Sequence, residues 1–125
     1  MSRLLLDTHV FIWWARADSK ILASWVEEIL DEGNSVYVSA VTAFEIEMKK
    51  RIKKIDFDDD VAKVVSEFGF EQLSMTMVHA SVAGALDWGH RDPFDRLLVA
   101  QAIANDMVLV TADDSIKSAP GVRVL

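Results

Sequence analysis

Short apolar segments alternate with amphipathic segments along the chain, and this alternation constrains the fold more than any other feature. Continuous apolar runs are typical of strands that are buried on both faces of a parallel sheet. We expect five strands, at residues 3–6, 35–38, 71–73, 107–110 and 122–125. Helices are expected at residues 9–16, 21–31, 41–55, 60–68, 77–86 and 93–105. The sequence therefore predicts an α/β protein whose parallel sheet is covered by helices on both faces.

The chain has a suitable length for a single domain, spanning residues 1–125, and contains no cysteine. The lack of cysteine excludes disulfide bonds, zinc–thiolate sites and thiol nucleophiles, and it is typical of a reducing compartment. The first apolar run ends at Asp7, too early for a signal peptide, and no segment reaches the roughly 20 apolar residues of a membrane span. We therefore expect a soluble cytoplasmic protein that does not contact a membrane.

The charge is unevenly distributed. The net charge is −7, which opposes passive binding of a polyanion. Five basic residues nevertheless fall within six positions, and they are Lys49, Lys50, Arg51, Lys53 and Lys54. This run is either a solvated helix face, with pairs such as Glu45–Lys49 and Glu47–Arg51, or a surface that contacts a nucleic-acid backbone.

Acidic residues gather where the expected strands end. In open α/β sheets, ligands bind beyond the carboxyl ends of the strands. The acids placed there, or at the start of the helix at residues 93–105, are Asp7, Glu45, Asp92, Asp95, Asp113 and Asp114.

Each of these acids also has a local explanation as a helix cap. Thr42 with Glu45 and Thr111 with Asp114 have the spacing of a capping box, and Asp92 precedes a proline as an N-cap would. Capping does not explain why so many carboxylates converge on one sheet edge, where they repel one another. Mg²⁺ or Mn²⁺ would offset that repulsion, because both ions prefer carboxylate oxygens. Such an ion can hold a phosphate and lower the pKa of an attacking water molecule, so the pattern predicts metal-dependent phosphodiester chemistry.

Four segments resemble one known family. They are residues 4–9 (LLLDTH), 39–46 (SAVTAFEI), 90–102 (HRDPFDRLLVAQA) and 109–113 (LVTAD). Together they closely resemble the PIN-domain ribonucleases, and specifically the VapC-type toxins of prokaryotic toxin–antitoxin systems. The resemblance spans nearly the whole chain in the same order, and the combination of four motifs is far more specific than any one of them.

The resemblance implies a three-layer α/β/α fold with strand order 3-2-1-4-5, and an Mg²⁺- or Mn²⁺-dependent endoribonuclease that is blocked by an antitoxin protein and forms a homodimer. It implies that Asp7 and Asp95 are direct or nearly direct ligands of the main metal. Glu45 and Asp113 would complete the cage or orient water, with Thr111 as the hydroxyl partner of Asp113. These acids could hold one ion or two.

Several residues near this site have more than one interpretation. Asp113 is favoured over Asp114 because it occupies the T-x-D position, and capping is favoured for Asp92. Arg96 either braces the acids or contacts phosphate.

The apolar run at residues 10–14 would cover the whole circumference of a helix. Either a partner such as the antitoxin covers part of it, around Trp13 and Trp14, or the helix at residues 21–31 does.

Two other functions compete with this interpretation. A phosphoacceptor switch would need adjacent acids after the first strand and a lysine after a late loop. Asp7 is instead followed by Thr8 and His9, and no lysine lies between Lys63 and Lys117. The other rival is a catalytically silent PIN-like binding or scaffold module, which the loss of a metal-site acid would indicate. All four acids are present.

Overall fold

The fold is a parallel five-stranded sheet between layers of helices, described for residues 1–125 by a computed structural model. The strands are β1 (Arg3–Leu6), β2 (Ser35–Ser39), β3 (Glu71–Leu73), β4 (Val108–Val110) and β5 (Arg123–Val124). They pair in the order β3-β2-β1-β4-β5, and every pairing is parallel. This confirms the predicted strand order and the predicted class.

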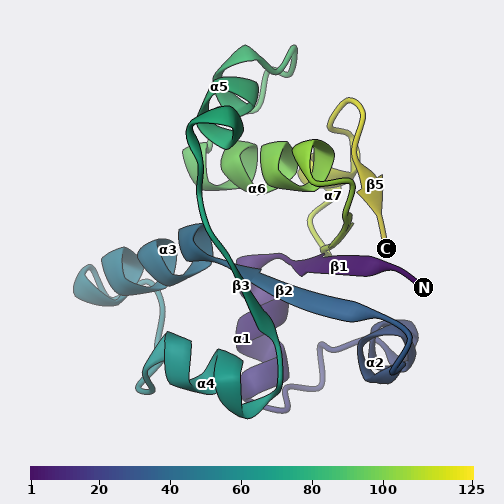
Figure 1. The fold of residues 1–125 in the computed structure, drawn as a ribbon. Helices are drawn as coiled ribbons and strands as arrows, with labels where there is room; N and C mark the ends of the chain where they lie inside the picture. Colours follow the sequence, from purple (N-terminus) through teal and green to yellow (C-terminus); the bar gives the residue numbers. More distant parts are fainter.

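Seven helices surround the sheet. They are α1 (Thr8–Ala15), α2 (Ala23–Leu30), α3 (Ala40–Arg51), α4 (Val61–Glu67), α5 (Met77–Ala85), α6 (Pro93–Ala104) and α7 (Asp114–Lys117). Figure 1 shows α1, α2 and α4 below the sheet and α5, α6 and α7 above it, while α3 extends from one end. None of these helices is long and apolar enough to cross a membrane.

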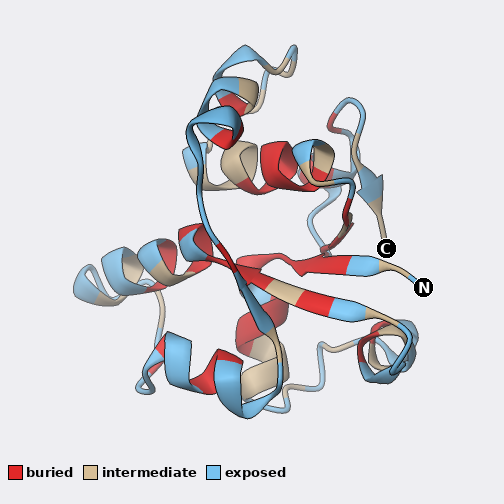
Figure 2. Cartoon of the chain, in the orientation of Figure 1, coloured by how far each residue is buried: buried red, intermediate tan, exposed pale blue.

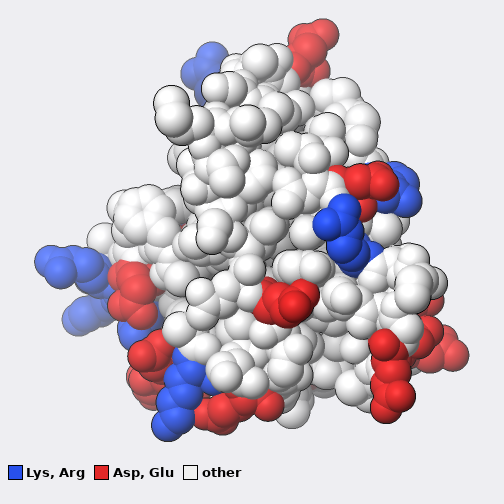
Figure 3. Space-filling view, viewed as in Figure 1, with Lys and Arg blue, Asp and Glu red and all other residues white.

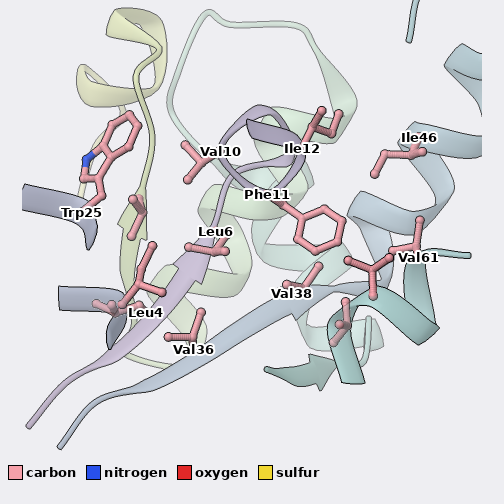
Figure 4. Packing of buried hydrophobic residues seen from close by; sticks show 14 of the residues in the cluster. Leu4, Leu6, Val10, Phe11, Ile12, Trp25, Val36, Val38, Ile46 and Val61 are labelled. Atoms are coloured by element: carbon pink, nitrogen blue, oxygen red, sulfur yellow. The ribbon is translucent and has the colours of Figure 1, made fainter. Parts of the chain in front are cut away.

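The two faces of the sheet build two separate hydrophobic cores. Along β1, Leu4 and Leu6 belong to the core under α1, α2 and α4, whereas Leu5 belongs to the core under α6 and α7. This alternation follows from the period of two along a strand. Figure 2 shows buried residues along β1 and on the helix faces that meet it, and Figure 4 shows Phe11 of α1 between Val38 and Ile46 in the first core.

The apolar circumference of α1 is largely covered from within the chain. Trp13 stacks on Trp25 of α2, with ring centroids 6.4 Å apart, while Trp14 packs against Phe68 and Phe70. Trp13 and Trp14 both remain partly exposed. The intramolecular interpretation therefore accounts for most of this surface, and a strip of it stays accessible.

One helix end differs from prediction by more than two residues, and one short helix was not predicted. The helix expected to reach residue 55 ends at Arg51, and Lys53 adopts a left-handed backbone with φ of 58°. No glycine marks that stop, although glycine is the residue that most often adopts this conformation. The short helix α7 was not predicted, because four residues are too few to show a helical period.

Candidate active site

A pocket of about 260 Å³ lies at the carboxyl ends of the central strands. Nine residues line it: Asp7, His9, Trp13, Glu45, Lys49, Asp92, Asp95, Ala112 and Asp113. The structure thus brings together all four acids of the predicted site, with Asp92 as a fifth. Asp114 is not among them.

Asp7 is buried at the end of β1, with a side chain that takes no part in capping. It occupies the N-cap position of α1 but accepts no capping hydrogen bond. Its Oδ2 instead accepts a 2.7 Å hydrogen bond from the Thr111 hydroxyl, whose oxygen accepts from the backbone N–H of Asp113 at 3.0 Å. Burial raises the pKa of Asp7 to about 6; the charge of Asp95 adds to that rise and the bond from Thr111 opposes it.

Glu45 lies on α3, and protein donors engage both of its carboxylate oxygens. The Thr8 hydroxyl donates to Oε1 at 2.7 Å, and Lys49 Nζ donates to Oε2 at 2.5 Å. Only 4% of Glu45 is exposed. The predicted capping box of Thr42 and Glu45 is wrong, because the N-cap of α3 is Ser39 and the Thr42 hydroxyl is buried against that of Thr8.

Asp95 is in the first turn of α6, and His90 lies against it. His90 Nε2 is 2.7 Å from Asp95 Oδ2, and the imidazole stacks on the Trp88 ring at a centroid distance of 4.6 Å. Burial raises the pKa of Asp95, as do the charges of Asp92 and Asp113, while the hydrogen bond with His90 opposes the rise. Sequence reasoning missed the contact of His90 with the site, although His90 opens the motif at residues 90–102.

The remaining acids separate into pocket residues and surface residues. Asp92 caps α6 as predicted, since its Oδ1 accepts from the N–H groups two and three residues on. The N-cap of α7 is Asp113, so the predicted capping box of Thr111 with Asp114 is wrong. Asp114 has a side chain that is 99% exposed and pairs with Lys117. Asp113 therefore both lines the pocket and caps a helix, whereas Asp114 lies on the surface outside the pocket.

Arg96 braces the chain beside the site and does not touch the acids. Its guanidinium donates four hydrogen bonds of 2.6–3.0 Å to backbone carbonyls, those of Ala83, Leu86, Trp88 and His90. These bonds fix the segment between α5 and α6. Arg96 therefore does not brace the acids directly, which was one of its two predicted roles; it braces the segment that carries His90.

The basic run at the end of α3 divides between two environments. Lys49 points into the pocket and forms the expected pair with Glu45, whereas Glu47 pairs with Lys50 at 3.5 Å in place of Arg51. Figure 3 shows the other basic side chains gathered on the left, where α3 ends. Lys50, Lys53 and Lys54 line a different hollow of the surface and not the acidic pocket.

The donor set of the pocket suits a hard divalent cation. Carboxylate oxygens are the ligands that Mg²⁺ and Mn²⁺ prefer, and the raised pKa values of Asp7 and Asp95 come partly from repulsion that a cation would relieve. In this structure, no three acidic or histidine side chains are arranged as the ligands of one ion. Thr111 forms a hydrogen bond with one oxygen of Asp7, and His90 forms one with one oxygen of Asp95. The second oxygen of each acid forms no hydrogen bond with a side chain.

Known sequences match this chain over nearly its whole length. The model of the PIN domain matches residues 4–122. Ribonuclease VapC22 of Mycobacterium tuberculosis is 28% identical over 121 residues, which cover 94% of this chain and 92% of that protein.

Solved structures share the fold at low sequence identity. A DNA-bound VapBC from Salmonella typhimurium superimposes with a TM-score of 0.73 and 19% identity, covering 100% of this chain and 98% of the other. VapBC2 from Rickettsia felis, bound to a DNA fragment from its promoter, gives a TM-score of 0.72 and 18% identity over 98% and 97% of the two chains. At such identities the likeness shows a common fold.

Proposed function

The chain belongs to the PIN domain family, and from that membership we propose that it is a metal-dependent endoribonuclease, the toxin of a VapBC-type toxin–antitoxin pair. One observation carries the proposal. Asp7 and Glu45 are buried, cap no helix, and lie with Asp95 and Asp113 around one pocket. The similarity to Ribonuclease VapC22 supports RNA as the substrate.

The residues of the pocket take distinct roles in this proposal. Asp7 and Asp95 would hold one Mg²⁺ or Mn²⁺ ion, and Glu45 and Asp113 would complete the charge of the site or orient water. When bound, the ion would polarise a phosphate oxygen and lower the pKa of the attacking water molecule. Thr111 fixes the orientation of Asp7 through its 2.7 Å hydrogen bond.

His90 orients the carboxylate of Asp95 by a hydrogen bond, as Thr111 does for Asp7. Its imidazole is held by stacking on Trp88 and by the brace that Arg96 forms on its backbone carbonyl. Groups that orient a metal ligand from behind limit its motion and raise its basicity. Asp7 and Asp95 are thus held by separate supports, which come from different segments of the chain.

We propose an antitoxin protein as the partner that covers this pocket. The similar solved structures are VapBC complexes, which supports a partner of that kind. Trp13 lines the pocket and remains partly exposed with Trp14, so a chain lying on this strip of α1 would also obstruct access to the acids. Trp14→Ala should weaken antitoxin binding about tenfold, since exposed tryptophans are frequent energetic centres of interfaces. Normal binding by a folded variant would contradict this.

We also propose that the chain forms a homodimer. Light scattering of the purified protein would measure its molar mass and test this.

The test of the enzymatic proposal is cleavage of a mixed RNA pool by the purified, antitoxin-free protein with Mg²⁺ or Mn²⁺. Cleavage should disappear with EDTA and in Asp7→Ala. Asp114→Ala should cleave normally, because that side chain is 99% exposed and outside the pocket. A folded wild-type protein that cleaves no RNA with either metal would refute the proposal and leave a binding or scaffold module as the function.

A further inference from the structure

Lys49 is the only basic side chain of the run at residues 49–54 that lines the acidic pocket. It follows Glu45 by one turn of α3, which places the two side chains on the same helix face. Its Nζ lies 2.5 Å from Glu45 Oε2 and 5.6 Å from the centroid of the Phe94 ring. Only 25% of the side chain is exposed. A positive charge is therefore built into the pocket that holds the five carboxylates.

The pocket keeps this ammonium group charged. Burial disfavours the charged form of Lys49, but the hydrogen bond with Glu45 and the charges of Glu45, Asp92 and Asp95 outweigh it and raise the lysine pKa. A lysine ammonium is a compact point charge with three N–H donors. Lys49 thus provides a fixed positive charge inside the pocket, beside Glu45.

The acids of the pocket differ in how far the protein already satisfies them. Both oxygens of Glu45 accept hydrogen bonds, from Thr8 and Lys49. Asp7 and Asp95 each accept a side-chain hydrogen bond on one oxygen only. An ion that used Glu45 as a ligand would share its oxygens with Thr8 and Lys49 and would lie close to the Lys49 ammonium group, and the repulsion between the two cations would oppose this.

We propose that Lys49 is the second cation of this site. The pocket then takes a single divalent ion, which is held by Asp7 and Asp95, while Lys49 neutralises Glu45 and keeps it out of direct ligation. This inference rests on the proposed metal-dependent function and settles the number of ions that the site accepts. In two-metal nucleases the second ion faces the phosphate, and the two N–H donors of Lys49 that Glu45 leaves free are suited to a phosphate oxygen.

Titration of the metal-free protein with Mn²⁺, followed by calorimetry and by the electron paramagnetic resonance signal of the free ion, tests the proposal without any measurement of activity. The wild type should bind one Mn²⁺ per chain. Lys49→Met removes the built-in cation and leaves Glu45 without a counter-ion, so it should bind two. Lys50→Met is the matched control and should bind one, because Lys50 pairs with Glu47 outside the pocket.

The double variant Glu45→Gln/Lys49→Met removes both charges of the pair and leaves the net charge of the pocket unchanged. It should bind one Mn²⁺ with a dissociation constant within about threefold of the wild type, and it tests the proposal even where Lys49→Met fails to fold. Two ions in the wild type, one in a folded Lys49→Met, or loss of binding in the double variant would each overturn the proposal. A wild type that binds no Mn²⁺ would overturn the proposed metal-dependent function itself.

Discussion

Replacement of Asp7 by asparagine should make the metal-free protein more stable, although it should abolish cleavage. Asp7 is 6% exposed and lies close enough to Asp95 for their charges to interact. Asparagine has nearly the same shape, and its carbonyl oxygen can still accept the hydrogen bond from Thr111. The substitution therefore removes the buried charge and little else.

The size of the effect follows from the pKa of Asp7. A rise from 3.8 to about 6 in the folded state corresponds to about 3 kcal/mol, at 1.36 kcal/mol per unit. The folded state binds this proton more tightly than the unfolded state. The stabilising contribution of protonated Asp7 is therefore complete below pH 3.8 and is lost as the pH rises through about 6. Asparagine does not titrate, so Asp7→Asn should gain up to about 3 kcal/mol over the wild type at neutral pH.

Urea unfolding in EDTA, followed by tryptophan fluorescence, measures this difference. The two proteins should have similar free energies of unfolding at about pH 4, and the variant should be the more stable at about pH 7.5. Asp114→Asn, whose side chain is 99% exposed, should behave as the wild type at both pH values. Excess Mn²⁺ should then stabilise the wild type but not Asp7→Asn. An Asp7→Asn protein that is no more stable than the wild type at neutral pH would refute this account of the pocket.

Three further predictions concern the acids and their supports. His90→Ala should weaken Mn²⁺ binding about tenfold, because partners that orient a metal ligand contribute about that much to affinity; unchanged affinity in calorimetry would show that Asp95 needs no support. Arg96→Met should lower the free energy of unfolding by about 3 kcal/mol, since it breaks four charge-assisted hydrogen bonds; a loss below about 1 kcal/mol on urea unfolding is the contrary result. Mn²⁺ affinity of the wild type should fall about tenfold from about pH 7.5 to about pH 5, because a proton competes for Asp7, whose pKa is about 6; a flat pH dependence would exclude Asp7 as a ligand.

The sequence predicted the sheet because the fold depends on strongly patterned segments. Runs such as residues 3–6 and 107–110 are apolar enough to be buried on both faces, and their order with the intervening helices restricts the topology. The errors fall where the pattern is weak. The left-handed turn at Lys53 has no glycine to announce it, and α7 has only four residues.

The site was predictable in its acids but not in their supports. Parallel strands bring their carboxyl ends to one edge, which was enough to place Asp7 and Asp113 together. The hydrogen bond from Thr111 to Asp7 joins residues 104 positions apart, and no local pattern predicts a contact at that separation. A local pattern does predict the pair of Glu45 and Lys49. The same i,i+4 spacing is common on solvated helix faces, however, so it does not indicate that the pair lies in a pocket.

Burial separates the acids that local structure explains from those that it does not. Asp92 and Asp113 cap α6 and α7, so each contributes to stability at its position. Asp7 and Glu45 cap no helix and are the two most buried acids of the chain, at 6% and 4% exposure. Burying a carboxylate costs free energy unless hydrogen bonds and opposite charge compensate it. Glu45 has that compensation in Lys49, whereas Asp7 forms no ion pair, and the Thr111 hydroxyl, the Thr8 backbone and His9 offset its burial only in part. Asp7 is thus the buried acid that the fold compensates least, and a bound cation is the partner that would complete the compensation.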